Sequence, residues 1–419
     1  MSATNNVFVQ GGVETQVNRL TKLTNSMSPI IDLALYISKL KGEEGENEAP
    51  YVQHIQTLLS SDKKDTVVTE LAKDASIFLT ENDKEVEGAF NLLLVIILGS
   101  TQEQLGVTVQ TLVDTLTKTE SNKTGLKQKI LLNLYNALPG NSPLRYQAFV
   151  GLVEATRQAD ELESLYNQLE YIDAWAAQWG IDQNTQRELY NYLFEVLSKA
   201  DEDKLAFNFL LKKLTTFNEN DKEAIEIAKD IILRAVSMEN YFAFEDLLQY
   251  KPIQNLKGTE EFELLDVFLN GTLSSYQSFA ASHSKLIQNA DSNICKMRLL
   301  SLASLGSENL SRELTYGDIA SSLQIPEEEV EMWVIDVIRA GLVEAKLDQL
   351  NKTVIVHRSI YRVFGQEQWK KLSTALSTWK ENLNEILAVV GNAKLIAGGA
   401  LQGGAASAII VEGEAKVTN

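Results

Sequence analysis

Apolar residues recur at helical spacing through most of the chain. Leu189, Leu193 and Val196, for example, share one helical face. Polar clusters that contain Gly or Pro, such as 119–125 and 139–143, separate these segments. Short helices joined by short loops over residues 51–290 predict a stack of antiparallel helix pairs, preceded by a polar or helical lead-in over 1–50. Because no strict repeat is present, we expect a degenerate helical-repeat solenoid.

The pattern changes after Asp291. It predicts a helix over 294–305, a short helix over 314–323, and a third helix that opens at Pro326 and ends at Gly341. Strict alternation follows over 343–348, and after a turn a second short strand is expected over 353–356. Three helices and a hairpin with one buried face predict a winged-helix domain over 291–365.

A last helix is predicted to start near Gln366. Its apolar residues recur with an average spacing of 3.5, the period of a coiled-coil seam: Trp369, Leu372, Leu376, Trp379, Leu383 and either Ile386 or Leu387. The stripe is too long for a lone terminal helix, so it either folds back on the winged helix or joins a bundle with other chains. We expect the early turns of this helix, which is predicted over 366–390, to pack inside the chain and its later turns to pack against partners. The Gly-, Ala- and Ser-rich segment 391–419 is expected to be a disordered tail.

The net charge of the chain indicates which classes of partner it is not expected to bind directly. Lys and Arg total 38 and Asp and Glu total 57, which gives a net charge of −19. This charge opposes binding to phosphate backbones and to anionic lipid surfaces. No secretory leader is recognisable over 1–12, and the most apolar run, 92–98, is too short to span a bilayer. We therefore expect a soluble protein with no membrane partner, and its single cysteine, Cys295, points to the cytosol or the nucleus. Of these two compartments, the resemblance described below favours a cytoplasmic location.

The sequence contains no pattern that is typical of catalytic, cofactor-binding or metal-binding residues. Ala405 and Ala406 stand where a phosphate-binding loop needs Lys and Ser or Thr. The three histidines are isolated in sequence, and a surface or structural role is expected for each: His54, His283 and His357. Cys295 is expected to be a buried, inert thiol. These observations predict a protein that is not an enzyme and carries no cofactor.

The winged helix raises the question of nucleic-acid binding. Its third helix would meet DNA with carboxylates in its first turns, since Glu327, Glu328 and Glu329 follow Pro326 directly. We therefore expect these glutamates to bind protein, with no sequence-specific nucleic acid as partner. Trp175 and Trp179 share one helix face, and we expect them to pack in the core between helix pairs rather than form an exposed patch.

The order of helical repeats, winged helix and terminal helix resembles the PCI-domain family, found in the proteasome lid, the signalosome and eukaryotic translation initiation factor 3. Within that family the chain is similar to the subunit M branch of the initiation factor over roughly 80–390. The most specific segments lie in the last hundred residues of that span: Leu314–Ile325, Val334–Arg339, Lys346–Gln349, Val354–His357, Arg362–Gly365 and Trp379–Asn384.

The resemblance implies an all-α helical-repeat (PCI-type) solenoid followed by a winged-helix domain with a small β-hairpin and a long C-terminal helix. It also implies a non-catalytic scaffold that supports assembly of the initiation factor and of the preinitiation complex on the small ribosomal subunit. The implied partners are other PCI and MPN subunits, with the ribosomal subunit reached through the complex. The candidate partner-binding residues are Trp369, Leu372, Leu376, Trp379, Leu383, Leu387, Glu327, Glu328 and Glu329. The alternative is a scaffold subunit of the signalosome or proteasome lid.

Overall fold

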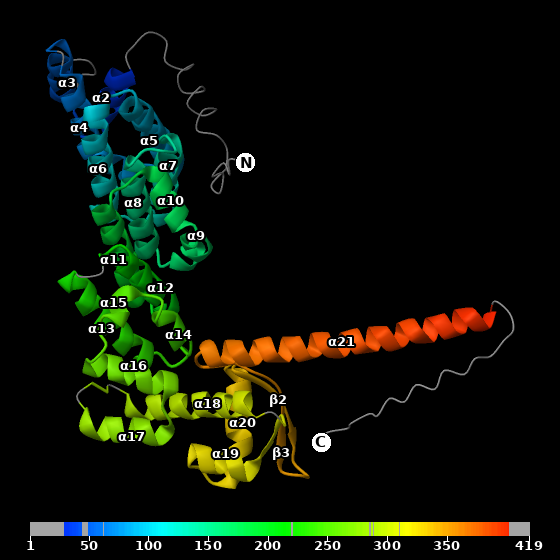
Figure 1. Cartoon of the computed structure of the whole chain (residues 1–419). Coiled ribbons are helices and arrows are strands. Elements are labelled where there is room, and N and C mark those ends of the chain that lie inside the picture. Colours follow the sequence, from blue (N-terminus) through cyan, green and yellow to red (C-terminus); the bar gives the residue numbers. More distant parts are fainter. Residues whose placement is uncertain are drawn as a thin grey trace. The chain divides into compact units, whose positions relative to one another are not determined.

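A computed structural model describes residues 29–43, 49–61, 63–218, 221–284, 286–287, 289–309 and 311–401 (Figure 1). The chain divides into two compact units, one ending at Asn218 and the other following it. Both units are mainly helical, and the only sheet in the described residues lies in the second. The predicted fold class is confirmed.

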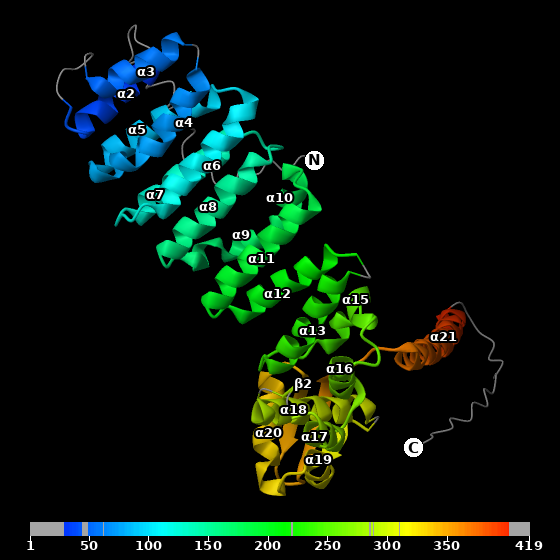
Figure 2. The same ribbon diagram turned by 90° about the vertical axis from the view of Figure 1, so that its left-hand side faces the viewer.

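The first unit is a stack of helices in two layers (Figure 2). Helices α4, α6 and α8 pack side by side in one layer, and α2, α5 and α7 pack in the other. Each helix contacts mainly its neighbours in sequence, as in a solenoid. The elements of this unit are α2 (Pro29–Leu40), α3 (Pro50–Ser60), α4 (Lys64–Asp74), a 3₁₀ helix (Ala75–Thr80), α5 (Asp83–Leu98), α6 (Gln102–Lys118), α7 (Thr124–Ala137), α8 (Leu144–Gln158), a 3₁₀ turn (Leu162–Leu165), α9 (Tyr166–Leu169), α10 (Ile172–Trp179), α11 (Gln183–Lys199) and α12 (Asp203–Thr215).

An aromatic cluster fills the core where α7, α8 and α10 meet. Trp175 and Trp179 are 3% and 1% exposed, and their rings lie 5.9 and 5.6 Å from the ring of Phe149. Tyr135 packs edge-on against Trp179 at 6.2 Å. The prediction that the two tryptophans belong to the core is confirmed.

The second unit begins with a smaller helical set. Its elements are α13 (Lys222–Ser237), α14 (Phe244–Leu247), α15 (Lys251–Gln254), α16 (Glu260–Asn270), α17 (Leu273–Ser282) and α18 (Ala290–Glu308). Phe244, Phe268 and Tyr276 form a row of ring contacts in its core. The ammonium group of Lys296 on α18 is buried and donates hydrogen bonds to carbonyl oxygens at the end of α13, those of Ala235, Val236 and Met238.

The winged helix follows, and it has one strand more than predicted. Its elements are β1 (Glu313–Thr315), α19 (Tyr316–Leu323), a 3₁₀ turn (Glu327–Glu329), α20 (Val330–Arg339), β2 (Val343–Asp348) and β3 (Thr353–Ser359). The sheet is antiparallel with the order β1-β3-β2. Leu314 and Thr315 were expected in a helix, but they pair with Val354 and Thr353 of β3 instead. A three-residue strand is too short to show alternation in sequence.

Three sequence-based expectations are corrected. The last helix, α21 (Gln366–Leu401), continues past Gly391, so the predicted tail boundary is wrong for 391–401, while 402–419 lie outside the described residues. Ala393, Lys394 and Leu395 favour a helix and outweigh the glycine beside them. Cys295 is exposed, not buried. It shares a side of α18 with Leu302, but only Leu302 lies far enough along the helix to enter the winged-helix core. The third helical segment begins as a 3₁₀ turn, and its α-helix starts at Val330.

Candidate partner-binding interface

The base of α21 is held by a partly buried arginine, Arg362. The guanidinium of Arg362 donates from Nε to the carbonyl oxygen of Leu300 (3.1 Å), from Nη1 to that of Gly271 (2.6 Å) and from Nη2 to Oγ of Ser301 (3.2 Å). Burial lowers the pKa of Arg362 to about 10, and the carboxylate of Glu308 only partly opposes this. The side chain therefore ties the segment before α21 to α18 and to the connection between α16 and α17.

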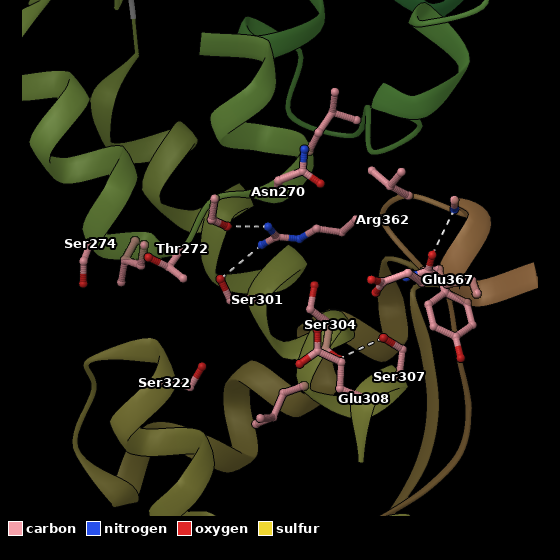
Figure 3. A pocket seen from close by; sticks show the side chains of 18 of the residues that line it. Asn270, Thr272, Ser274, Ser301, Ser304, Ser307, Glu308, Ser322, Arg362 and Glu367 are labelled. Atoms are coloured by element: carbon pink, nitrogen blue, oxygen red, sulfur yellow. Dashed lines mark hydrogen bonds between the residues drawn. The ribbon is translucent and has the colours of Figure 1, made fainter. Parts of the chain in front are cut away.

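A polar cleft of about 680 Å³ lies beside this arginine (Figure 3). Its walls carry mainly hydroxyl and amide groups, including those of Thr272, Ser304 and Gln324, together with the carboxylates of Glu308 and Glu367. Figure 3 shows Arg362 reaching across the upper part of the cleft to Ser301 on α18. Groups of this kind can hydrogen-bond water or polar peptide atoms.

The two residues just before α21, Phe364 and Gly365, make further contacts with the same unit. The backbone N–H of Phe364 donates to Oε1 of Glu245 on α14 (2.9 Å), and the N–H of Gly365 donates to Oε1 of Gln368 (3.0 Å). The rings of Phe364 and Trp369 meet edge-on at 4.9 Å. These contacts fix where the helix starts, while its side chains from Trp369 onward are largely exposed.

The apolar stripe of α21 is exposed along its whole length. Trp369 is 61% exposed, Trp379 62% and Leu387 65%, and the intervening stripe residues Leu372, Leu376, Leu383 and Ile386 are also exposed. The expectation that the early turns pack inside is therefore wrong, apart from the contact of Trp369 with Phe364. The buried core of the winged helix consists of residues from α18, α19, α20, the sheet and the loops beside them, and among the described residues none of α21 belongs to it.

The three predicted glutamates lie together in the 3₁₀ turn before α20. All three are exposed. Glu327 forms an ion pair with Lys352 in the hairpin turn (3.4 Å), while Glu328 and Glu329 form no ion pair within the described residues. These glutamates and the α21 stripe are separate surfaces on different elements of the second unit.

Sequence reasoning missed a second exposed apolar group. Met332, Ile335 and Ile338 on α20 are 56%, 47% and 37% exposed, and Leu350 in the hairpin turn is 97% exposed. Since α20 has apolar residues on both sides, its periodicity alone does not say which side is buried. Only the packing of Val330, Val334 and Val337 into the core identifies the outer face.

The described part of the chain contains no group of three or more His, Cys, Asp or Glu residues placed to hold a metal ion. His54 lies on the surface beside Glu70 (3.2 Å). Among the described helices, none is both long enough and apolar enough to cross a membrane.

Comparison with known proteins decides the family. The family model for the PCI domain matches residues 263–358, and one described as "eIF3 subunit M, C-terminal helix" matches residues 362–390. A protein from Phaeosphaeria nodorum, "Eukaryotic translation initiation factor 3 subunit M", is 34% identical over 375 residues, which cover 86% of this chain and 85% of the relative. The chain belongs to the eukaryotic translation initiation factor 3 subunit M family.

Members from distant organisms give the same result. The subunit M protein of Dictyostelium discoideum is 31% identical over 379 residues, covering 87% of this chain and 93% of the relative. That of Pongo abelii is 27% identical over 325 residues, covering 76% and 86%. The resemblance seen in sequence is confirmed, and the alternative of a signalosome or proteasome-lid subunit is not favoured. The C-terminal helix match begins at Arg362 and includes the whole exposed stripe.

Proposed function

We propose that this chain is a non-catalytic scaffold subunit of translation initiation factor 3, held in the assembled factor through α21. Its partners are other PCI and MPN subunits, and it reaches the small ribosomal subunit only through the complex, where it supports preinitiation assembly in the cytoplasm. It binds no specific nucleic-acid sequence and no membrane. The names of its relatives support membership of the factor.

The exposed stripe of α21 is the observation that carries this proposal. From Trp369 to Leu387 it extends about 27 Å at 1.5 Å per residue. Burying each leucine contributes about 1.5–3 kcal/mol, so a helix with this many exposed apolar residues is strongly stabilised by a partner. The spacing of 3.5 suits a helical bundle with other chains.

The proposal assigns a role to each predicted segment. Residues 51–290 form the helical-repeat scaffold, with α2 from the predicted lead-in over 1–50 packed into its first layers, and residues 291–365 form the winged-helix docking module. Residues 366–390 form the bundling helix, which carries the partner-binding stripe. The glutamates at 327–329 form a second protein contact.

Paired variants of α21 test the proposal. Leu376→Gln with Leu383→Gln removes two stripe residues, while Thr374→Gln with Glu381→Gln changes two exposed positions on the opposite face and serves as the control. All four substitutions introduce glutamine, which is a good helix former, so both pairs should keep α21 helical. Native mass spectrometry of complexes purified with the tagged chain, at low and high salt, should show loss of the subunit only for the stripe pair.

Truncation after Trp379 should have the same effect, because the cores of both units lie upstream. Normal incorporation of the truncated chain or of the stripe pair would contradict the proposal. A metal or nucleotide bound in stoichiometric amount to the purified protein would contradict its non-catalytic part.

A further inference from the structure

The outer face of α20 and the tip of the hairpin form one continuous surface. Gln349 in the hairpin turn donates from Nε2 to Oε2 of Glu331 on α20 (2.9 Å), and Lys352 pairs with Glu327 (3.4 Å). These two contacts hold the turn against the start of α20. Leu350, next to Gln349, therefore lies at the same end of the surface as Met332.

This surface, which we call the α20 face, has an apolar centre and an acidic end. Met332, Ile335 and Ile338 follow each other at steps of three along the exposed side of the helix, and all are more than a third exposed. Side chains three apart on a helix lie on neighbouring turns of the same side, so these three make a stripe. A stripe of this kind on one side of a short helix is typical of a surface that receives an amphipathic helix.

The charges around the stripe indicate the chemistry of its partner. Most charged groups of the face are already matched: Glu327 by Lys352, and Asp336 by Arg339 at 3.0 Å. Glu331 accepts hydrogen bonds from Tyr316 and Gln349. Glu328 and Glu329 are exposed and form no ion pair among the described residues. The unmatched charge is therefore negative and lies at the start of α20.

We propose that the α20 face binds an amphipathic helix of another subunit, one whose apolar stripe is flanked by Lys or Arg. The inference rests on the proposed scaffold function and adds the class of partner to it. The apolar stripe supplies the contact area, and Glu328 and Glu329 select a basic flank and reject an acidic one. The same carboxylates disfavour a nucleic-acid backbone.

Site-specific photo-crosslinking in the assembled complex tests this inference. A benzoylphenylalanine placed at Ile335 should crosslink to a segment of another subunit that has apolar residues at steps of three or four and Lys or Arg beside them. The same probe at Leu383 reports on α21 and should crosslink to partners if the scaffold function is right. Crosslinks at Leu383 but none at Ile335 overturn only the α20 inference. Failure at both positions overturns the scaffold function as well.

A crosslink from Ile335 to nucleic acid, to a second copy of this chain or to an acidic segment would also overturn the inference.

A matched pair of variants measures the strength of the contact. Ile335→Glu on α20 and Val107→Glu on α6 both place a carboxylate at an apolar position about half exposed, 47% and 55%. Both variants should stay folded by circular dichroism.

We expect Ile335→Glu to weaken binding to the crosslinked partner by about tenfold or more, since one buried apolar side chain is lost. Val107→Glu should bind as the unmodified chain does. Glu328→Lys with Glu329→Lys should also weaken binding, and the difference should shrink as salt rises. Equal affinities for Ile335→Glu and Val107→Glu would remove the α20 face from the interface.

Discussion

Arg362 donates a hydrogen bond of 2.6 Å to the carbonyl oxygen of Gly271, a residue 91 positions earlier in the chain. Gly271 is in the connection between α16 and α17, and Arg362 lies four residues before α21 starts. The two other hydrogen bonds of the guanidinium reach α18. A partly buried cation held by three acceptors on two parts of the unit fixes the segment from which α21 departs. Arg362 is therefore a positioning residue for the partner-binding helix.

Replacing this arginine should loosen α21. Arg362→Ala leaves the carbonyls of Leu300 and Gly271 without their donor, so the free energy of unfolding should fall by about 1–3 kcal/mol. Nitroxide labels on Cys295, which is exposed on α18, and on a cysteine introduced by Thr378→Cys should report the distance between α18 and α21. We expect a broader distance distribution in Arg362→Ala. Arg339→Ala, which breaks only an exposed pair with Asp336, should leave the distribution unchanged. An unchanged distribution in both variants would show that Arg362 does not position the helix.

Stability should depend on pH through Lys296. Burial lowers the pKa of its ammonium to about 7 from the ordinary value of 10.5. Between those values the unfolded chain binds more protons than the folded chain, so the free energy of unfolding should rise with pH from about 7 to about 10. In Lys296→Met the free energy of unfolding should rise less steeply with pH over this range, because the titrating ammonium is gone. At pH 9 the variant should also be less stable by about 1–3 kcal/mol, because carbonyls at the end of α13 lose their donor. Urea unfolding at pH 7, 8 and 9 measures both effects, and parallel curves for the two proteins would contradict the assignment.

Because α6 and α8 pack closely, Gly151 on α8 should not tolerate a larger residue. A Cβ added at Gly151 would lie 2.5 Å from Cγ1 of Val113, and this β-branched side chain has little freedom to move. Gly151→Ala should therefore lower the free energy of unfolding by about 1–3 kcal/mol. At Gly88 in α5 an added Cβ meets nothing within 4 Å, so Gly88→Ala should stabilise by about 0.5–1 kcal/mol. Denaturant titrations should show a lower free energy of unfolding for Gly151→Ala and a higher one for Gly88→Ala. A free energy of unfolding that does not fall in Gly151→Ala would show that α6 and α8 can move apart without cost.

Substitutions of two tryptophans should have different effects, one on the stability of the free protein and the other on assembly of the complex. Trp179 is 1% exposed and Trp379 is 62% exposed. Trp179→Ala should destabilise the free protein by about 3–5 kcal/mol, because it leaves a cavity beside Phe149 and Tyr135. Trp379→Ala should leave the melting temperature of the free protein nearly unchanged and reduce its incorporation into the complex. A large drop in melting temperature for Trp379→Ala would show that α21 packs within the chain.

Patterns with a strong local cause were predictable from the sequence. The stripe from Trp369 to Leu387 and the alternation from Val343 to Leu347 each repeat often enough to define an element. Features that depend on packing were not predictable. Cys295 and Leu302 lie on the same side of α18, and only the position of the winged helix decides that one is exposed and the other buried. The strand β1 exists because β3 lies beside it, and its three residues carry no period of their own.

The same limit applies to the binding surfaces. The 3.5-residue spacing identified the α21 stripe, but the expectation that its first turns pack inside was wrong, since the helix reaches its own unit only through the contacts around Phe364. The exposed stripe of α20 was missed because Met332, Ile335 and Ile338 alternate with equally apolar core residues. Whether such residues face the core or the solvent is a property of the tertiary structure.

The exposure of α21 also connects the amount of this protein to the amount of its partners. A newly made subunit presents Trp369, Leu376 and Trp379 to the solvent until another chain covers them. Exposed apolar stripes promote aggregation and are recognised by chaperones and proteases. A subunit made in excess should therefore be removed faster than one in the complex. The uncovered helix would then act as a quality-control signal that keeps the stoichiometry of the assembly balanced.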